Sequence, residues 1–229
     1  MSNELSELKL YFWPTPNGYK ISVLLEMLGL EYQLVPINIT EGQQHEPDFV
    51  ARFPSRKIPG LIHHRGGGTV DKVFMESGAI LLYLAEWQKQ LLPAEPNQYW
   101  QVLQWLFWQV GGLGPIAGQA HHFRLYAPES IEYAIHRYTQ ETHKYYAVLE
   151  SQLSTSPFLA NELSIADVAV LPWVYRCARQ GVDLDLFPSV AAWYEFLMSR
   201  DDVKRGFAVG ESLIATGDLT GAGAKQHLF

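Results

Sequence analysis

Hydrophobic and polar positions alternate between strand-like and helix-like periods along the first third of the chain. Residues 8–13 form an alternating, aromatic-rich run that predicts a first strand. After the turn-forming residues 14–18, apolar positions recur at helical spacing from Tyr19, and Gly29 is suited to end that helix. Residues 31–37 predict a second strand, so this region should be a parallel strand-helix-strand crossover.

The pattern continues with a short helix and two more strands. Residues 46–50 predict a helix with proline in its first turn, and residues 60–63 and 72–74 predict a β-hairpin. A helix with apolar residues at helical spacing follows from Glu76. The order βαβαββα is that of an α/β thioredoxin-like domain with a four-stranded mixed sheet, which we place at residues 1–92.

The rest of the chain shows helical stripes and no convincing alternating strand. Two prolines in residues 93–98 mark a linker, and residues 99–212 predict an all-α domain. Within it, Ser164 and Asp167 form a capping box with aspartate in place of glutamate, so loss of the serine should cost about 1 kcal/mol. The glycine-rich residues 213–229 predict a disordered tail.

Charge and cysteine content narrow the class of protein. The 229 residues carry a net charge of -7 and no lysine- or arginine-rich block, which argues against nucleic acid or an anionic membrane as a partner. No basic, apolar leader begins the chain, and the longest apolar stretch is too short to span a bilayer. Cys177 is the only cysteine, so no internal disulfide can form. We expect a soluble, cytoplasmic protein.

Two motifs that invite a functional interpretation do not support one. The eight histidines include the adjacent pairs 63–64 and 121–122, whose side chains usually point apart, and no His-Glu-x-x-His pattern occurs, so we assign no metal. The glycines at 66–68 precede a strand and not a helix, which argues against a phosphate-binding loop.

Two other segments have the chemistry of a peptide site. Pro59 supplies no amide to its strand, so the backbone beside it can pair with a ligand. At Glu76-Ser77 a strand gives way to a helix, whose N-terminus offers unpaired amides and partial positive charge to a carboxylate. The serine hydroxyl adds a donor and the glutamate a partner for an ammonium group. A peptide such as glutathione carries all of these groups.

With these features in order, the chain resembles the cytosolic glutathione transferases from residue 8 to about residue 210. Its closest form looks like the bacterial nu class, the Ure2-like glutathione-dependent disulfide-bond oxidoreductases. The segments that carry this narrower resemblance are residues 11–18, 76–85, 109–115 and 121–123.

The resemblance implies a set of glutathione ligands. Glu76 and Ser77 would hold the γ-glutamyl head, and the backbone of Ile58, before a cis Pro59, would pair with the cysteinyl part. Further implied ligands are Gln44 and Lys57 toward the glycine end, and Arg137 from the helical domain. From the residues alone, Arg137 is a solvated arginine on a charged helix.

The resemblance also places Thr15 and Asn17 at the glutathione thiol, as the catalytic pair. The alternative is that they only cap a helix and form a turn. Tyr11, whose counterpart donates to the thiol in other classes, alternates with apolar residues and is interpreted as core. By this resemblance, close relatives have histidine where this chain has Tyr19. This departure leaves the shape of the pocket mouth open. Cys177, in the helix from Asp167, is interpreted as a buried structural thiol.

The favoured function is a glutathione-dependent disulfide-bond reductase. Because no cysteine stands at the first strand-helix joint, both sulfurs must come from ligands, so two glutathione molecules or glutathione disulfide should bind. Two alternatives stay open. The first is an enzyme that conjugates glutathione to electrophiles or reduces hydroperoxides. The second is a non-catalytic regulatory protein that binds glutathione. A homodimer is implied by the resemblance.

Overall fold

The computed structural model describes residues 7–66, 70–211 and 213. The described residues of Met1–Leu84 and Asp202–Phe229 form one compact unit, and Ala85–Asp201 form another. The predicted domain limits remain a prediction, because this division by packing falls inside a helix and not at a connecting segment. Of the predicted disordered tail, only Leu213 belongs to the described residues.

The first unit is built on a mixed sheet, which has four strands in the described residues, in the order β2-β1-β3-β4. The strands are β1 (Glu7–Phe12), β2 (Gln33–Pro36), β3 (Gly60–His64) and β4 (Lys72–Phe74). β1 pairs in parallel with β2 and antiparallel with β3, and β3 pairs antiparallel with β4. The predicted crossover unit and hairpin are therefore confirmed.

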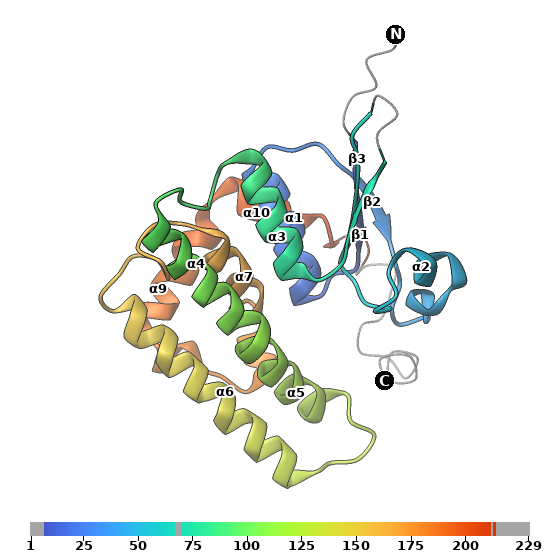
Figure 1. Ribbon diagram of the computed structural model, residues 1–229. Coiled ribbons are helices and arrows are strands. Elements are labelled where there is room, and N and C mark those ends of the chain that lie inside the picture. The colour runs from blue at the N-terminus through green and yellow to red at the C-terminus, as the bar shows by residue number, and fades with distance from the viewer. Residues whose placement is uncertain (1–6, 67–69, 212, 214–229) are drawn as a thin grey trace. The chain divides into compact units, whose positions relative to one another are not determined.

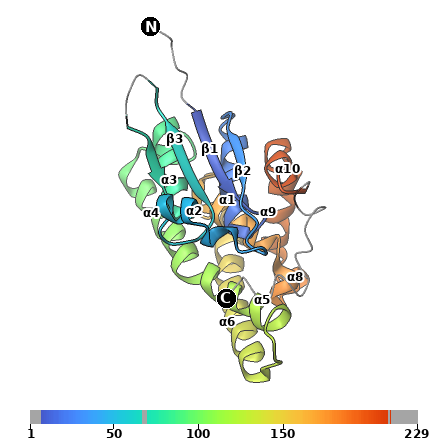
Figure 2. The ribbon, with the colours of Figure 1, turned by 90° about the vertical axis from the view of Figure 1, so that its right-hand side faces the viewer.

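Helices cover both faces of this sheet. They are α1 (Pro16–Met27), α2 (Pro47–Arg52), α3 (Ser77–Gln88) and α10 (Asp201–Ala208). Figures 1 and 2 show α1 and α3 on one face and α2 on the other. The alternation of β1 explains this layering: Leu8, Leu10 and Phe12 are buried, while Tyr11 packs with Phe49 and Phe53 of the α2 segment.

The final helix, α10, returns to the first unit and packs on α1. A Cβ at Gly206 would lie 2.5 Å from the Cα of Val23, so only glycine allows the two backbones to approach this closely. The ring of Phe207 packs on Tyr19 at a centroid distance of 4.8 Å, and Arg205 binds Glu26 at 2.9 Å. Residues from the two ends of the described chain thus share one core.

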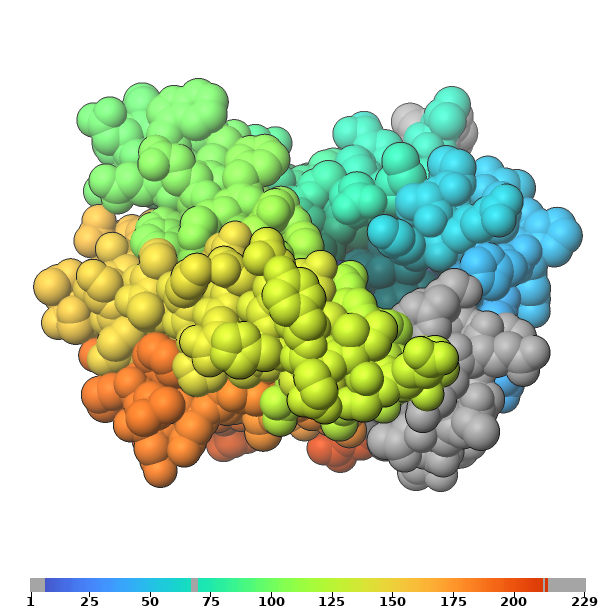
Figure 3. Space-filling model, turned by 90° about the horizontal axis from the view of Figure 1, so that it is seen from below, coloured from blue at the N-terminus to red at the C-terminus, as the bar shows by residue number. Residues whose placement is uncertain are grey.

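The second unit is helical, as predicted. Its helices are α4 (Pro96–Trp108), α5 (Gly114–Leu125), α6 (Glu132–Leu153), α7 (Ile165–Val174), α8 (Cys177–Gln180) and α9 (Pro188–Ser199). Between α4 and α5 lies a π-helical turn, Gln109–Leu113, at a pair of glycines, so the two helices run on without a loop. Figure 1 shows α4 with α5 beside the long helix α6. Figure 3 shows α6, in yellow, exposed on one face.

Helix α7 is the centre of the second unit, and each of its ten residues is buried. The predicted capping box is present: Ser164 accepts from Ala166 N at 3.3 Å, and Asp167 accepts from Ser164 N at 3.1 Å. Asp167 also accepts from Leu159 N at 3.1 Å and from Trp193 Nε1 at 3.0 Å. One carboxylate therefore fixes the start of α7, the preceding loop and helix α9.

None of the helices in the described part of the chain combines the length and the hydropathy needed to span a bilayer.

Candidate functional site

Strand register brings the predicted glutathione-binding segments of the first unit to one end of the sheet. Residue Tyr11, near the end of β1, pairs with Gly60 at the start of β3, and Leu61 pairs with Phe74 at the end of β4. The segments after β1, before β3 and after β4 therefore leave the sheet together. Strand β2, parallel to β1, ends there as well. Ligands of open α/β sheets bind beyond the carboxyl ends of parallel strands.

The first of these segments is the joint between β1 and α1, with Thr15 at its centre. Thr15 is the N-cap of α1, and its hydroxyl oxygen accepts from Gly18 N at 3.2 Å. A Cβ at Gly18 would collide with the carbonyl oxygen of Trp13, so the tight turn requires glycine. Thr15 therefore does cap the helix, and the segment does form a tight turn. This arrangement leaves the hydroxyl proton of Thr15 available, because a hydroxyl accepting one bond can still donate another. Asn17 lies partly buried in the first turn of the helix.

The second segment leads into β3. The peptide bond between Ile58 and Pro59 is cis, as the resemblance implied, and Ile58 packs against the cluster of Phe49, Phe53 and Ile62. Lys57 is exposed. Gln44 is buried in a 3-10 turn after β2, with its side-chain nitrogen 3.3 Å from the His45 ring.

The third segment is the start of α3, where Glu76 has an unusual backbone. Its φ is 68°, in the left-handed region that glycine favours, and its carbonyl oxygen accepts from Ile80 N at 3.0 Å. Such a conformation costs on the order of 1–3 kcal/mol for a residue with a side chain, and strained residues of this kind gather at ligand sites. Glu76 is exposed, so its carboxylate is accessible to a ligand.

Next to it, Ser77 meets a residue that the sequence analysis missed. Lys20 Nζ lies 3.2 Å from Ser77 Oγ, and Lys20 is only 1% exposed. Burial lowers the Lys20 pKa from 10.5 to about 7, and the Glu76 carboxylate acts in the opposite direction. The sequence did contain one indication that Lys20 is buried. Lys20 stands four residues before Leu24 and so shares the apolar face of α1.

Two tyrosines of this unit pack against its aromatic residues, Tyr11 partly buried and Tyr19 fully buried. Tyr11 packs edge-on against Phe53 at a centroid distance of 4.9 Å. Tyr19 is buried between Phe12 and Phe207, at 5.7 and 4.8 Å. Tyr19 is therefore a buried packing residue, and its effect on the pocket mouth stays a prediction.

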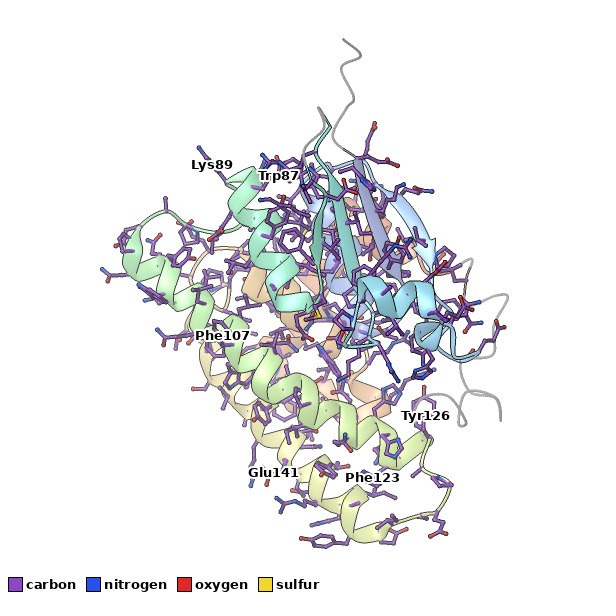
Figure 4. The ribbon with its side chains drawn as sticks, turned by 45° about the vertical axis from the view of Figure 1, so that its right-hand side comes forward. Trp87, Lys89, Phe107, Phe123, Tyr126 and Glu141 are labelled. Carbon is purple, nitrogen blue, oxygen red and sulfur yellow. The ribbon has the colours of Figure 1, made fainter. Side chains whose placement is uncertain are left out.

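The remaining predicted ligand, Arg137, lies in the second unit on α6. It is exposed, and its charge helps to lower the pKa of Glu141 one turn on, after the larger effect of the Lys144 hydrogen bond. Figure 4 shows Glu141 on the outer side of α6. Its role as a glutathione ligand stays a prediction.

Cys177 differs from its expected position. It begins the short helix α8, after α7 has ended at Val174, and it is partly buried. Helix α7 contains Pro172 and ends two residues later, so the predicted continuous helix is wrong. Burial raises the pKa of the Cys177 thiol, which fits an unreactive side chain.

Two further observations concern other parts of the described chain. Its His, Cys, Asp and Glu side chains form no group of three or more suited to a metal ion. A hollow of about 430 Å³ in the second unit contains none of the predicted site residues. It is lined by Gln101, Gln104, Trp105, Trp108, Gln152, Leu159 and Asn161.

Comparisons with known proteins identify the family of the chain. Residues 6–86 match the family model "Glutathione S-transferase, N-terminal domain", and residues 132–196 match "Glutathione S-transferase, C-terminal domain". Disulfide-bond oxidoreductase YfcG of Escherichia coli (strain K12) is 46% identical over 210 residues, covering 90% of this chain and 94% of its own.

Two solved structures extend the comparison. A glutathione transferase from Pseudomonas putida, with one glutathione disulfide bound per subunit, is 37% identical, with a TM-score of 0.84 over 89% of this chain and 91% of its own. A homolog from Lodderomyces elongisporus, with two glutathione molecules per subunit, is 36% identical, with a TM-score of 0.84 over 89% of this chain and 98% of its own. The chain belongs to the glutathione S-transferase family.

Proposed function

We propose that the protein is a glutathione-dependent disulfide-bond reductase that activates the thiol of bound glutathione with Thr15 and Asn17. The observation that carries the proposal is that the Thr15–Asn17 joint and the Glu76-Ser77 helix start leave the same end of one sheet. The charged γ-glutamyl head and the thiol of one glutathione molecule can both bind at this end of the sheet. The 46% identity to a disulfide-bond oxidoreductase supports this choice of reaction.

Glutathione is held by three kinds of group. The N-terminus of α3 and the Ser77 hydroxyl receive the α-carboxylate of the γ-glutamyl head, and Glu76 receives its ammonium group. The backbone of Ile58 pairs with the cysteinyl residue. Gln44 and Lys57 follow toward the glycine carboxylate.

Thiol activation requires donors, because a free thiol with a pKa near 8.5 is mostly protonated at neutral pH. The hydroxyl proton of Thr15, the Asn17 amide and the N-terminus of α1 each favour the thiolate. The thiolate attacks one sulfur of the disulfide and releases the other as a thiol after protonation. A second glutathione thiolate then attacks the mixed disulfide, which yields glutathione disulfide and the second thiol. This scheme needs no protein cysteine, and relatives that bind two glutathione molecules or glutathione disulfide are consistent with it.

Parallel assays test the proposal. Turnover of bis(2-hydroxyethyl) disulfide with glutathione should exceed turnover of an aryl halide. A strong aryl halide rate without disulfide turnover would instead favour the conjugating alternative. If calorimetry detects no binding of glutathione or of glutathione disulfide, both the reductase and the transferase function are rejected. Binding without turnover in any assay would favour the regulatory protein.

The proposed assembly is a homodimer in the reducing cytoplasm. Trp100 and Phe107 lie seven residues apart on one side of α4 and are 60% and 65% exposed. Figure 4 shows Phe107 on the outside of this helix. Exposed aromatic side chains of this size are typical of subunit contacts. Light scattering of the Trp100→Glu variant should show a monomer where the parent protein is a dimer.

A further inference from the structure

A lysine lies buried directly behind the proposed γ-glutamyl site. Lys20 is 1% exposed, and its Nζ is 3.2 Å from the hydroxyl oxygen of Ser77, which is 8% exposed. Lysine is rarely buried to this extent, because its ammonium group loses hydration. It lies on the first helix and contacts the first residue of α3, so its ammonium group is placed directly beside the proposed ligand head.

Burial and a nearby charge together bring the pKa of Lys20 close to neutral pH. Burial lowers its pKa to about 7, and the Glu76 carboxylate partly opposes this effect. Glu26, an acid on the same helix, is engaged by Arg205 at 2.9 Å and by Tyr32 at 3.2 Å. An added negative charge at Ser77 would therefore act strongly on the Lys20 proton.

The hydrogen bond to Ser77 also determines where the serine proton points. A hydroxyl has one donor and two acceptor positions. When Lys20 is an ammonium group it can only donate, so the Ser77 oxygen accepts and the serine proton is directed elsewhere. When Lys20 is a neutral amine it can accept the serine proton, which then points away from a ligand.

We propose that Lys20 is a positioning residue: its ammonium group directs the Ser77 hydroxyl toward the α-carboxylate of the bound γ-glutamyl group, and ligand binding draws a proton from solvent onto Lys20. This inference rests on the proposed function, in which Ser77 receives that carboxylate. Linkage gives the sign of its consequence. Affinity is highest when Lys20 is already protonated, and it falls by up to about tenfold per pH unit above neutrality.

Calorimetry with S-methylglutathione tests the proposal without interference from a ligand thiol. At pH 8, the binding enthalpy is measured in two buffers with different ionisation enthalpies, which counts the protons taken up. The parent protein should take up on the order of one proton more than the Lys20→Met variant. The variant should bind about tenfold more weakly at neutral pH, since it lacks a charge-assisted hydrogen bond. Lys9→Met, on β1, is the matched control, because this lysine is partly buried and pairs with Glu7 at 3.7 Å, and it should behave as the parent protein does.

Each outcome has a distinct meaning. Equal proton uptake in the parent protein and the Lys20→Met variant overturns the role of Lys20 while the glutathione site stands. Failure of the parent protein to bind S-methylglutathione overturns the proposed function itself. If the variant does not fold, the parent protein alone decides: an affinity that stays constant from pH 6 to 8.5 contradicts the proposal, and a decline above about pH 7 supports it.

Discussion

The hydroxyl of Ser22 donates a hydrogen bond of 2.8 Å to the carbonyl oxygen of Gly206, 184 residues further along the chain. This bond joins α1 to α10, two helices that the sequence separates by the whole of the helical unit. It also lies two residues beyond Lys20, on the helix that begins at the proposed thiol site. The packing of α10 on α1 therefore contributes to the stability of the unit that holds the proposed site.

Gly206→Ala should destabilise the protein by about 1–3 kcal/mol, because the new Cβ would press on the Val23 backbone. The free energy of unfolding in urea measures this effect. Gly111→Ala is the control, since a Cβ there meets nothing within 4 Å, and it should leave stability unchanged or raise it by up to about 1 kcal/mol. Equal effects of the two substitutions would contradict the close approach of α10 to α1.

Asp167→Asn should destabilise the second unit by about 1–3 kcal/mol, because its amide group would face the Ser164 N–H and leave that donor unpaired. Burial raises the Asp167 pKa from 3.8 to about 6, so the folded state holds a proton that the unfolded state releases. The contribution of Asp167 to stability is thus largest below about pH 4 and is lost as pH rises to about 6.

The stability advantage of the parent protein over Asp167→Asn should therefore shrink across this pH range, by up to about 1.4 kcal/mol per pH unit. Urea unfolding at a series of pH values measures it. An advantage that grows with pH would show that the hydrogen bonds to the carboxylate outweigh its burial.

Asn17→Ala should lower the kcat/KM of disulfide reduction by about 10- to 100-fold, because the thiolate loses a donor. Tyr11→Phe should leave it unchanged, since Tyr11 packs on Phe53 in the core. The ultraviolet absorbance of the bound thiolate, followed against pH, should show a raised thiol pKa for the Asn17 variant alone. The opposite result would move the sulfur site to the strand.

Glu76→Ala should weaken glutathione binding while the protein remains folded, because the ammonium group loses its partner. Glu76→Gly should bind equally weakly but be more stable than Glu76→Ala by about 1–2 kcal/mol, since glycine adopts a φ of 68° without strain. Calorimetry and urea unfolding separate the two effects. Unchanged affinity in both variants would refute the role of Glu76.

Local patterns allowed most of the first unit and the start of α7 to be predicted from the sequence. Strand alternation identified the four strands of the sheet, and the spacing of Ser164 and Asp167 identified a capping box that is present. These features depend on residues within a few positions of one another.

Features that depend on distant residues could not be predicted. Nothing near Lys20 in the sequence indicates that its ammonium group is buried against Ser77, 57 residues away. Helical periodicity beyond Asp201 likewise does not reveal that α10 packs on α1, since that partner is set by tertiary packing. The end of α7 before Cys177 was also missed, although Pro172 was a visible signal.

The return of α10 has a practical consequence for dissecting the protein. A fragment that stops at Leu84 would leave the ring of Tyr19 and the side of Val23 uncovered, because Phe207 and Gly206 cover them. The compact unit is therefore discontinuous in sequence. Anyone wishing to isolate this unit would have to join α10 to the thioredoxin-like portion, because a simple truncation would expose the apolar surface that α10 covers.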